Sequence, residues 1–208
     1  MNDMHGNSLK TLRQNLLSKR QEFAKKDGFT QIEIKLLANL SRFMANKKES
    51  VSSVALYYPI QGELDLRPVL LEWAKSKPNR CLALPFARAD KHLEFYQWQS
   101  NDALILSKHG ILEPNPNNLE RPQITPDCIL IPCVGWSQSS QAGKSHYWRL
   151  GYGGGYFDRT LAQLRKNNPH LLCVGIGFDW QQLNDQQWQS QTHDEPLDLL
   201  ITESISPS

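Results

Sequence analysis

The chain has 208 residues, enough for one domain that buries roughly 70% of the surface exposed by its unfolded form. Hydrophobic residues make up 39% and charged residues 21%, a globular mix that excludes a disordered chain. Twenty-three basic and 21 acidic side chains leave a net charge of +2, which argues against a strongly basic nucleic-acid-binding protein. Four of the 12 glycines fall within residues 151–155, and this concentration requires an explanation.

We expect the four cysteines to be buried, reduced thiols, because none forms a CxxC pair and their spacings do not suit a zinc site. The N-terminus lacks the apolar segment of a secretory signal, and no run reaches the roughly 18 apolar residues that a membrane helix needs. The sequence therefore predicts a cytoplasmic protein with no membrane partner. The cysteines are Cys81, Cys128, Cys133 and Cys173.

The N-terminal segment predicts an amphipathic helix over 8–26. Apolar residues from Leu9 to Phe23 keep an approximate helical spacing, and Asp27-Gly28 breaks the pattern. Residues 1–26 hold six basic and two acidic side chains, a charge of +4, so the remainder of the chain carries −2. This basic segment is either a solvated helix face or a cationic wall that faces an anionic ligand.

A second helix is predicted from about Thr30 to Asn46, because apolar residues again recur at helical spacing. Thr30 followed by Glu33 predicts a capping box at its start. We expect residues 1–46 to form a helical segment that packs on a single domain spanning residues 1–208.

Beyond residue 50 the pattern changes to short, continuous apolar runs, each followed by a proline or a polar residue. Continuous hydrophobicity is typical of strands covered on both faces, as in a parallel sheet. Helical patterns between the runs predict an α/β fold of three layers, αβα, with a mixed, mainly parallel sheet. An alternating segment over 92–98 predicts an edge strand or a hairpin that leads into 104–106, and 115–118 and 137–146 are predicted loops. The apolar runs are 54–58, 81–84, 128–131, 171–178 and 197–201.

The glycine-rich stretch reads Arg149-Leu-Gly-Tyr-Gly-Gly-Gly-Tyr-Phe-Asp-Arg159 and opens a predicted helix. Successive backbone N–H groups in such a loop form an anion nest at a helix N-terminus, where the helix dipole also favours phosphate. Arg149 and Arg159 add charged donors, and Asp158 adds an oxygen ligand of the kind that Mg²⁺ prefers. The stretch is neither a dinucleotide fingerprint nor a Walker A motif. Taken alone, it predicts either phosphate binding or a tight structural turn.

The order of these residues closely resembles the signature of the 5-formyltetrahydrofolate cyclo-ligase family, Arg-Leu-Gly-x-Gly-x-Gly-Tyr followed by Tyr or Phe and then Asp. Other motifs that resemble this family occur in the expected order along nearly the whole chain. They are Lys10-x-x-Arg13, Tyr58-Pro-Ile-Gln-Gly-Glu-Leu-Asp65, Gly110-Ile-Leu-Glu-Pro114, Asp127-Cys-Ile-Leu-Ile-Pro132, His193-Asp-Glu-Pro-Leu-Asp198 and Ile201-Thr-Glu203.

The resemblance implies an enzyme, a ligase that forms a carbon–nitrogen bond. It would close 5-formyltetrahydrofolate to 5,10-methenyltetrahydrofolate, consume ATP, release ADP and phosphate, and use Mg²⁺ as cofactor. An N-formyl group is amide-like and therefore a poor electrophile, so phosphorylation of its oxygen would create a leaving group before N10 attacks. The implied partners are these small molecules, with no nucleic acid and no membrane, and we expect a monomer.

The resemblance also assigns roles to individual residues. The residues expected to bind the folate substrate are Tyr58, Glu63, Gly154 and Tyr156. The residues expected to bind ATP are Lys10, Arg13, Arg149, Leu150, Gly151, Tyr152, Gly153, Gly154, Gly155, Tyr156 and Phe157. Asp158 and Asp194 are expected to hold Mg²⁺, and Arg149 and Tyr156 to be catalytic.

Several of these residues have a structural alternative. Glu63 or Asp158 would also suit the start of the helix that follows it, because acidic side chains favour helix N-termini. Tyr58 would suit the buried end of a strand, and Lys10 a solvated position. His109 and His193 are interpreted as ordinary loop histidines, and Trp180 and Trp188 as packing residues.

Two positions depart from the family pattern. Trp136-Ser137 stands where the family usually has Phe-Asp, with a longer loop before Arg149, and Phe157 stands where many members have Tyr. The fold alone leaves two other functions open. One is an enzyme like the sugar-phosphate isomerases and CoA transferases, which share a related α/β architecture, and the other is a non-catalytic folate- or nucleotide-binding protein.

Overall fold

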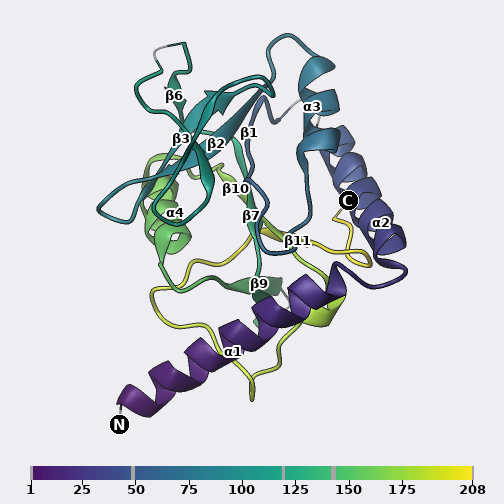
Figure 1. Cartoon of the computed structure of the whole chain (residues 1–208), viewed down its shortest axis with the longest axis vertical. Coiled ribbons are helices and arrows are strands. Elements are labelled where there is room, and N and C mark those ends of the chain that lie inside the picture. Colours follow the sequence, from purple (N-terminus) through teal and green to yellow (C-terminus); the bar gives the residue numbers. More distant parts are fainter. Residues whose placement is uncertain (1, 48–49, 119, 142–143, 208) are drawn as a thin grey trace.

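The computed structural model describes residues 2–47, 50–118, 120–141 and 144–207 (Figure 1). Its helices are α1 (Asn2–Phe23), α2 (Phe29–Asn46), α3 (Arg67–Lys75), α4 (Tyr156–Asn167) and the short 3₁₀ helix η1 (Asp179–Gln181). Its strands are β1 (Ser53–Ala55), β2 (Cys81–Ala87), β3 (Leu93–Trp98), β4 (Leu104–Leu106), β5 (Leu112–Pro114), β6 (Gln123–Ile124), β7 (Cys128–Pro132), β8 (Gly135–Gln141), β9 (Lys144–Leu150), β10 (Leu172–Ile176) and β11 (Leu199–Ile201).

In the described part of the chain, the main sheet has seven strands in the order β11-β10-β7-β1-β2-β3-β6. The five strands from β11 to β2 are parallel to one another, whereas β3 runs antiparallel to β2 and to β6. This arrangement confirms the mixed, mainly parallel sheet. The alternating segment over 92–98 forms a strand, β3, as predicted, but β3 lies between β2 and β6 rather than at the edge. It does not form a hairpin with 104–106, because β4 pairs with β5.

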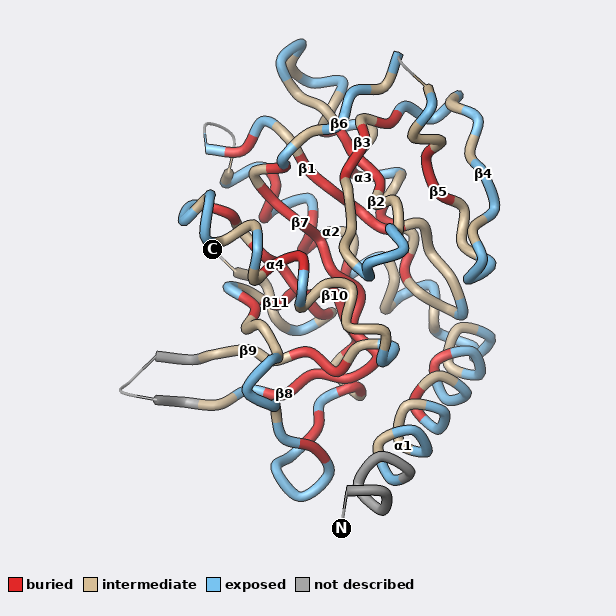
Figure 2. Tube along the Cα trace, turned by 90° about the vertical axis from the view of Figure 1, so that its left-hand side faces the viewer, coloured by how far each residue is buried: buried red, intermediate tan, exposed pale blue. Residues whose placement is uncertain are grey.

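Helices cover both faces of this sheet, which confirms the three-layer αβα fold (Figure 1). Along β7, Cys128 and Leu130 pack into the cluster that contains side chains of α2 and α3, while Ile129 and Ile131 pack into the cluster that contains Leu161 of α4. Because successive residues of a strand point to opposite faces, a strand buried on both sides must be apolar throughout. The buried residues are accordingly concentrated in the central strands (Figure 2).

A third, smaller cluster attaches α1 to the loops at one end of the sheet. Leu16 of α1 packs with Val134, Leu150, Leu183 and Trp188, and further leucines of the same helix pack beside it. The helix begins at Asn2 and ends at Phe23, so it lies a few residues earlier than predicted. Among the described residues no helix is both long enough and apolar enough to cross a membrane.

The predicted capping box at the start of α2 is wrong. The N-cap position is occupied by Gly28, whose φ of 89° is left-handed, and no side chain caps the helix there. The helix begins at Phe29, so Thr30 lies inside its first turn rather than at the cap. A glycine adopts this backbone conformation without steric cost, which is why the chain turns here between two helices.

The predicted loop over 137–146 is also wrong for 137–141 and 144–146, because β8 and β9 form an antiparallel hairpin from Gly135↔Leu150 to Gln141↔Lys144; residues 142 and 143 lie outside the described residues. The segment is polar, so its sequence lacks the hydrophobic alternation that predicts a strand. The indole of Trp136 is buried and donates to the Phe178 carbonyl (2.9 Å), and Trp148 Nε1 donates to Ser139 Oγ (3.1 Å). Tertiary and cross-strand contacts therefore supply what the local hydrophobic pattern lacks.

Candidate active site

A cavity of about 1020 Å³ opens at the carboxyl ends of β1, β2 and β7. Its walls come from the segments that leave these strands, from the stretch 149–159, from the β4–β5 hairpin, from α1 and from the segment 191–195. In open α/β sheets, ligands bind in such crevices outside the carboxyl ends of the strands. The volume is that of a site for substantial small molecules.

The glycine-rich stretch forms the loop between β9 and α4 and lines this cavity. Gly153 has a φ of 98°, and Gly155, the N-cap of α4, has a φ of 69°. Both values lie in the left-handed region that favours glycine. The first backbone N–H groups of a helix have no partner within the helix, so the start of α4 brings hydrogen-bond donors and a positive dipole end to the cavity wall.

Arg13 connects the N-terminal helix to this loop. Its Nε donates to the carbonyl of Gly151 (2.9 Å), and the side chain lines the cavity. Lys10 lies one turn earlier on α1, exposed and outside the cavity lining. Of the two basic residues predicted for this wall, only Arg13 is therefore brought to the site.

Arg149 and Asp158 form an ion pair inside the cavity wall. Arg149 Nη2 lies 3.2 Å from Asp158 Oδ2, and both side chains are largely buried. The guanidinium also lies over the ring of Phe157, 5.3 Å from its centroid. Asp158 is thus partly engaged by the protein itself, and its carboxylate fixes the direction of Arg149.

Asp194 lies close to this pair. The backbone N–H of Glu195 points at Asp158 Oδ1 (3.5 Å), and Asp194 accepts a hydrogen bond from the N–H of Gln191 (2.7 Å). Both aspartates line the cavity. Across the described residues no group of three or more His, Cys, Asp or Glu side chains could hold a metal ion. Two carboxylates suit a Mg²⁺ ion that takes its other ligands from phosphate and water, but not a site built by protein alone.

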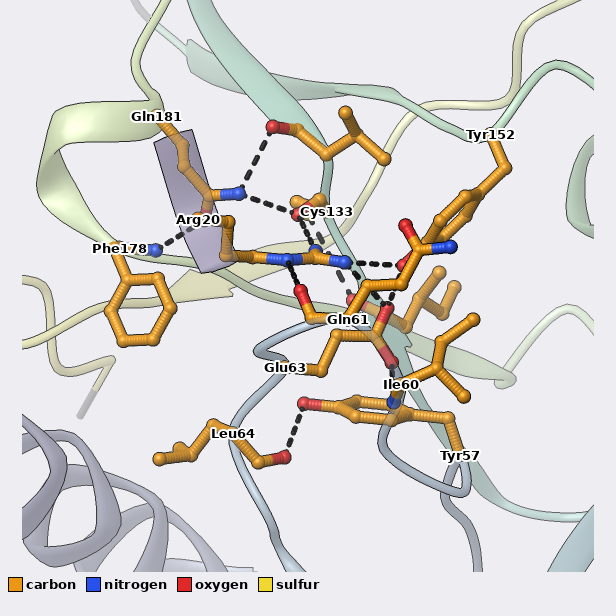
Figure 3. A network of polar contacts seen from close by, with 12 residues as sticks. Arg20, Tyr57, Ile60, Gln61, Glu63, Leu64, Cys133, Tyr152, Phe178 and Gln181 are labelled. Carbon is orange, nitrogen blue, oxygen red and sulfur yellow. Dashed lines mark hydrogen bonds and ion pairs between the residues drawn. The ribbon is translucent and has the colours of Figure 1, made fainter. Parts of the chain in front are cut away.

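A buried polar network connects three residues of the cavity wall, Gln61, Glu63 and Tyr152, to Arg20, which is buried and does not itself line the cavity (Figure 3). Arg20 of α1 is 2% exposed; its Nε donates to the Gln61 carbonyl (3.0 Å) and its Nη1 to the Cys133 carbonyl (3.2 Å). Its Nη2 lies 3.4 Å from Glu63 Oε1 and also donates to the Tyr152 hydroxyl. The backbone N–H of Ile60 donates to Glu63 Oε2 (2.9 Å). Burial raises the pKa of Glu63, although the positive charge of Arg20 and these hydrogen bonds oppose the shift.

Arg20 contacts the site residues Gln61 and Glu63, and no motif in the sequence points to it. In the sequence it stands out only as part of the basic N-terminal segment. A signal was nevertheless present, because Arg20 follows Leu16 by four residues and precedes Phe23 by three, and so falls on the apolar stripe of the helix. A charged residue on a buried stripe needs a partner, and here the partner is Glu63.

The remaining predicted residues also line the cavity. Tyr58 leaves the end of β1 and its ring is covered by the guanidinium of Arg67 at 4.5 Å. Tyr156 begins α4, and its hydroxyl lies 3.0 Å from Nε2 of His109 in the β4–β5 hairpin. His109 and His193, interpreted as loop histidines, therefore stand in the cavity wall.

The two tryptophans interpreted as packing residues do pack. Trp188 belongs to the buried cluster under α1 and also lines the cavity, and the ring of Trp180 stacks on Phe178 with an interplanar angle of 8°. Trp136 and Ser137, which stand where the family usually has Phe-Asp, both lie in β8. Trp136 is buried in the core, and Ser137 is also buried.

Comparison with known proteins shows the family to which the chain belongs. The family model described as "5-formyltetrahydrofolate cyclo-ligase family" matches residues 5–203. The chain belongs to the 5-formyltetrahydrofolate cyclo-ligase family. The match spans every wall of the cavity, from α1 to the 191–195 segment.

Relatives named 5-formyltetrahydrofolate cyclo-ligase include a Mycoplasma pneumoniae protein, 28% identical with 92% of this chain and 96% of the relative covered. An Escherichia coli relative of the same name is 29% identical, with 75% and 78% covered. Among solved structures, the 5,10-methenyltetrahydrofolate synthetase of Aquifex aeolicus gives a TM-score of 0.69 at 29% identity, covering 95% of this chain and 91% of that one. The corresponding Mycoplasma pneumoniae enzyme gives 0.70 at 23% identity, covering 94% and 99%, and agrees in fold.

Proposed function

We propose that this member of the cyclo-ligase family converts 5-formyltetrahydrofolate to 5,10-methenyltetrahydrofolate with ATP, releasing ADP and phosphate. One observation carries the proposal. A single cavity joins a glycine loop at a helix N-terminus, flanked by Arg13 and Arg149, to a buried carboxylate, Glu63, beside tyrosine rings. The first part suits a triphosphate, and the second suits a flat, donor-rich heterocycle.

The chemistry explains why both parts must face one space. The formyl group on N5 is an amide, whose resonance makes the carbon a poor electrophile. Its oxygen attacks the γ-phosphorus of ATP, and the bond to the bridging oxygen of ADP breaks. N10 then attacks the formyl carbon, the carbon–oxygen bond breaks to release phosphate, and N10 loses its proton. The protein must hold the formyl oxygen in line with the γ-phosphate and neutralise developing charge.

We assign the nucleotide to the glycine loop. Backbone groups of Gly151, Gly153, Gly154 and Gly155 would hold its phosphates, with Leu150, Tyr152 and Phe157 beside them. Arg13 and Arg149 would offset the negative charge, and Arg149 would act directly on the transferred group because Asp158 fixes its orientation. Lys10 would contribute only to the longer-range field, since it lies outside the cavity lining.

The folate would lie on the other side of the cavity. The carboxylate of Glu63 would accept hydrogen bonds from the pterin edge, and the rings of Tyr58 and Tyr156 would supply flat apolar contacts. Tyr156 begins α4 beside Gly154, so it would stand between the two substrates and act on the reacting group. Asp158 and Asp194 would hold Mg²⁺, which when bound neutralises charge on the phosphates.

The protein would act in the cytoplasm as a monomer on small molecules, with neither nucleic acid nor membrane as partner. Its overall charge of +2 supports this reading, because a nucleic-acid-binding surface usually requires a larger basic excess.

The test is to incubate the purified protein with 5-formyltetrahydrofolate, Mg²⁺ and ATP and to follow the methenyl product by its near-ultraviolet absorbance. We expect product only when ATP is present. Product formed at the same rate without ATP, or no product at all, would overturn the proposal. An isomerase or CoA-transferase activity would not need ATP, and a binding protein would bind folate or ATP without turnover.

A further inference from the structure

Tyr152 of the glycine loop and Glu63, the carboxylate assigned to the folate, both line the cavity, and the Tyr152 hydroxyl points at that carboxylate (Figure 3). Its hydroxyl donates to Glu63 Oε1 (2.5 Å) and accepts a hydrogen bond from Nη2 of Arg20. The guanidinium of Arg20 also lies over the tyrosine ring, 5.7 Å from its centroid. One side chain thus links the proposed nucleotide loop to the proposed folate carboxylate.

The carboxylate of Glu63 already has three donors. Arg20 and Tyr152 share Oε1, and the backbone N–H of Ile60 takes Oε2. A carboxylate has about four lone-pair sites, and the Glu63 side chain is only 3% exposed. A ligand edge that offers two adjacent donors therefore needs one of the present partners to leave.

Tyr152 is the partner that is free to leave. Arg20 is held by two backbone carbonyls besides Glu63 and is 2% exposed, and Ile60 belongs to the same turn as Glu63. Tyr152 is 39% exposed and stands between Gly151 and Gly153, the second of which has a φ of 98°. The glycines on both sides let the backbone rotate with little steric resistance.

We infer that the Tyr152 hydroxyl occupies the position on Glu63 that the folate donor edge takes, and that nucleotide bound on the glycine loop withdraws it. Without ligand, the hydroxyl stabilises a buried negative charge that is costly to leave without donors. When phosphates engage the loop around Gly151–Gly155, Tyr152 moves with it and Glu63 becomes available. Nucleotide therefore strengthens folate binding, and by linkage folate strengthens nucleotide binding by the same factor. This inference rests on the proposed function.

The experiment compares the wild type with Tyr152→Phe, which keeps the ring and removes the hydroxyl. Titration calorimetry would measure 5-formyltetrahydrofolate binding with and without a non-hydrolysable ATP analogue and Mg²⁺. For the wild type we expect tighter folate binding when the analogue is present. For Tyr152→Phe we expect folate binding without nucleotide to be about tenfold tighter, the size of one hydrogen bond to a charged group, and little further effect of the analogue.

Tyr96→Phe is the matched control, because the Tyr96 hydroxyl also donates to a carboxylate, that of Glu94 (2.9 Å), but lies outside the cavity lining. It should behave as the wild type, and the thermal unfolding midpoints of both variants should show that they fold. The reciprocal titration, nucleotide binding with and without folate, should lose its coupling in Tyr152→Phe alone.

Two results would overturn the inference. In one, Tyr152→Phe keeps the wild-type folate affinity and the wild-type effect of nucleotide. In the other, Tyr152→Phe binds folate more weakly, which would make the hydroxyl a folate contact rather than a competitor. If instead the wild type neither binds nor converts 5-formyltetrahydrofolate, the proposed function itself fails and this inference fails with it.

Discussion

At the scale of single residues, Glu63 is a carboxylate whose environment opposes its charge. The side chain is almost fully buried, and burial raises its pKa more than Arg20, Tyr152 and the Ile60 N–H lower it. A carboxyl group accepts two donors of a ligand edge through both of its oxygens only while it is ionised. The charge state of this one group should therefore control folate binding.

We expect folate affinity to fall on acidification at a higher pH than an ordinary glutamate would give. The pKa of Glu63 is raised, so the carboxylate takes up its proton before pH reaches the usual range and loses an acceptor oxygen. Binding measured from pH 7 down to pH 4 would show this. Glu63→Gln should bind weakly with a flat profile, and Glu72→Gln, on the exposed face of α3, should follow the wild type. A Glu63→Gln profile identical to that of the wild type would contradict the prediction.

Asp158 forms an ion pair with Arg149, and we have also proposed that it holds Mg²⁺. Asp158→Asn keeps the shape of the side chain and removes the charge, so we expect turnover to fall by roughly 100-fold or more and a higher Mg²⁺ concentration to be needed. Turnover measured against Mg²⁺ concentration checks this, with Asp185→Asn, on an exposed turn, as the control. If the Mg²⁺ requirement of Asp158→Asn stays that of the wild type, the residue acts only through Arg149.

At the scale of elements, Asp127 joins the starts of two neighbouring parallel strands, β1 and β7. Its Oδ2 accepts hydrogen bonds from the backbone N–H and hydroxyl groups of both Ser52 and Ser53, at 2.8–2.9 Å. Burial alone would raise the pKa of Asp127, but these four donors outweigh it and hold the pKa below its usual value. Both strands lead directly into the cavity wall, so this contact helps to set the position of the site.

We expect Asp127→Asn to lower the free energy of unfolding by about 1 kcal/mol at neutral pH, a modest figure because the site is partly exposed. A depressed pKa means that the ionised carboxylate stabilises the fold above the pKa of the unfolded chain, and that this contribution is lost as pH falls through the lowered value. Urea unfolding at pH 7 and at pH 3 should give a difference between variant and wild type that shrinks at the lower pH. An equal difference at both pH values would argue against it.

The β8–β9 hairpin is an element that the local hydrophobic pattern of the sequence does not predict. The polar sequence over 137–146 predicts a loop, yet residues 135–141 pair with residues 144–150 in an antiparallel hairpin. The pairing is supported from outside the segment, since Trp136 reaches Phe178 and the N–H of Leu183 donates to the Trp136 carbonyl (2.7 Å). Such partners lie more than 40 residues away and leave no periodic signal in the hairpin itself.

At the scale of the whole molecule, the cavity is assembled from segments that are far apart in the chain. Arg13 and Gly151 are separated by 138 positions and Arg20 and Tyr152 by 132, yet both pairs are hydrogen bonded. A ligand in this cavity would touch α1, the glycine loop and the 191–195 segment together. Ligand binding should therefore stabilise the fold as a whole.

We expect Mg·ATP and 5-formyltetrahydrofolate each to raise the unfolding midpoint. A ligand at a hundred times its dissociation constant adds about 2.7 kcal/mol, or roughly 5–10 °C for a chain of this size. Arg13→Gln should reduce the shift caused by Mg·ATP, because Arg13 lines the cavity, whereas Lys25→Gln, exposed beyond the end of α1, should keep it. Equal shifts in both variants would remove Arg13 from the nucleotide site.

The sequence by itself determined the layers of the fold and most of the candidate site. Continuous apolar runs require strands covered on both faces, and the ordered glycines of residues 151–155 require a loop with left-handed backbone. These are local demands, and a single sequence displays them.

Only the tertiary structure decided which charges meet. It placed Arg13 in the cavity wall but left Lys10 outside, it paired the buried Arg20 with Glu63, and it brought the Tyr152 hydroxyl onto the same carboxylate. These outcomes depend on how α1 docks against loops more than 100 residues away. The energy of a buried ion pair comes from that docking, because it excludes water around two groups that local sequence does not connect.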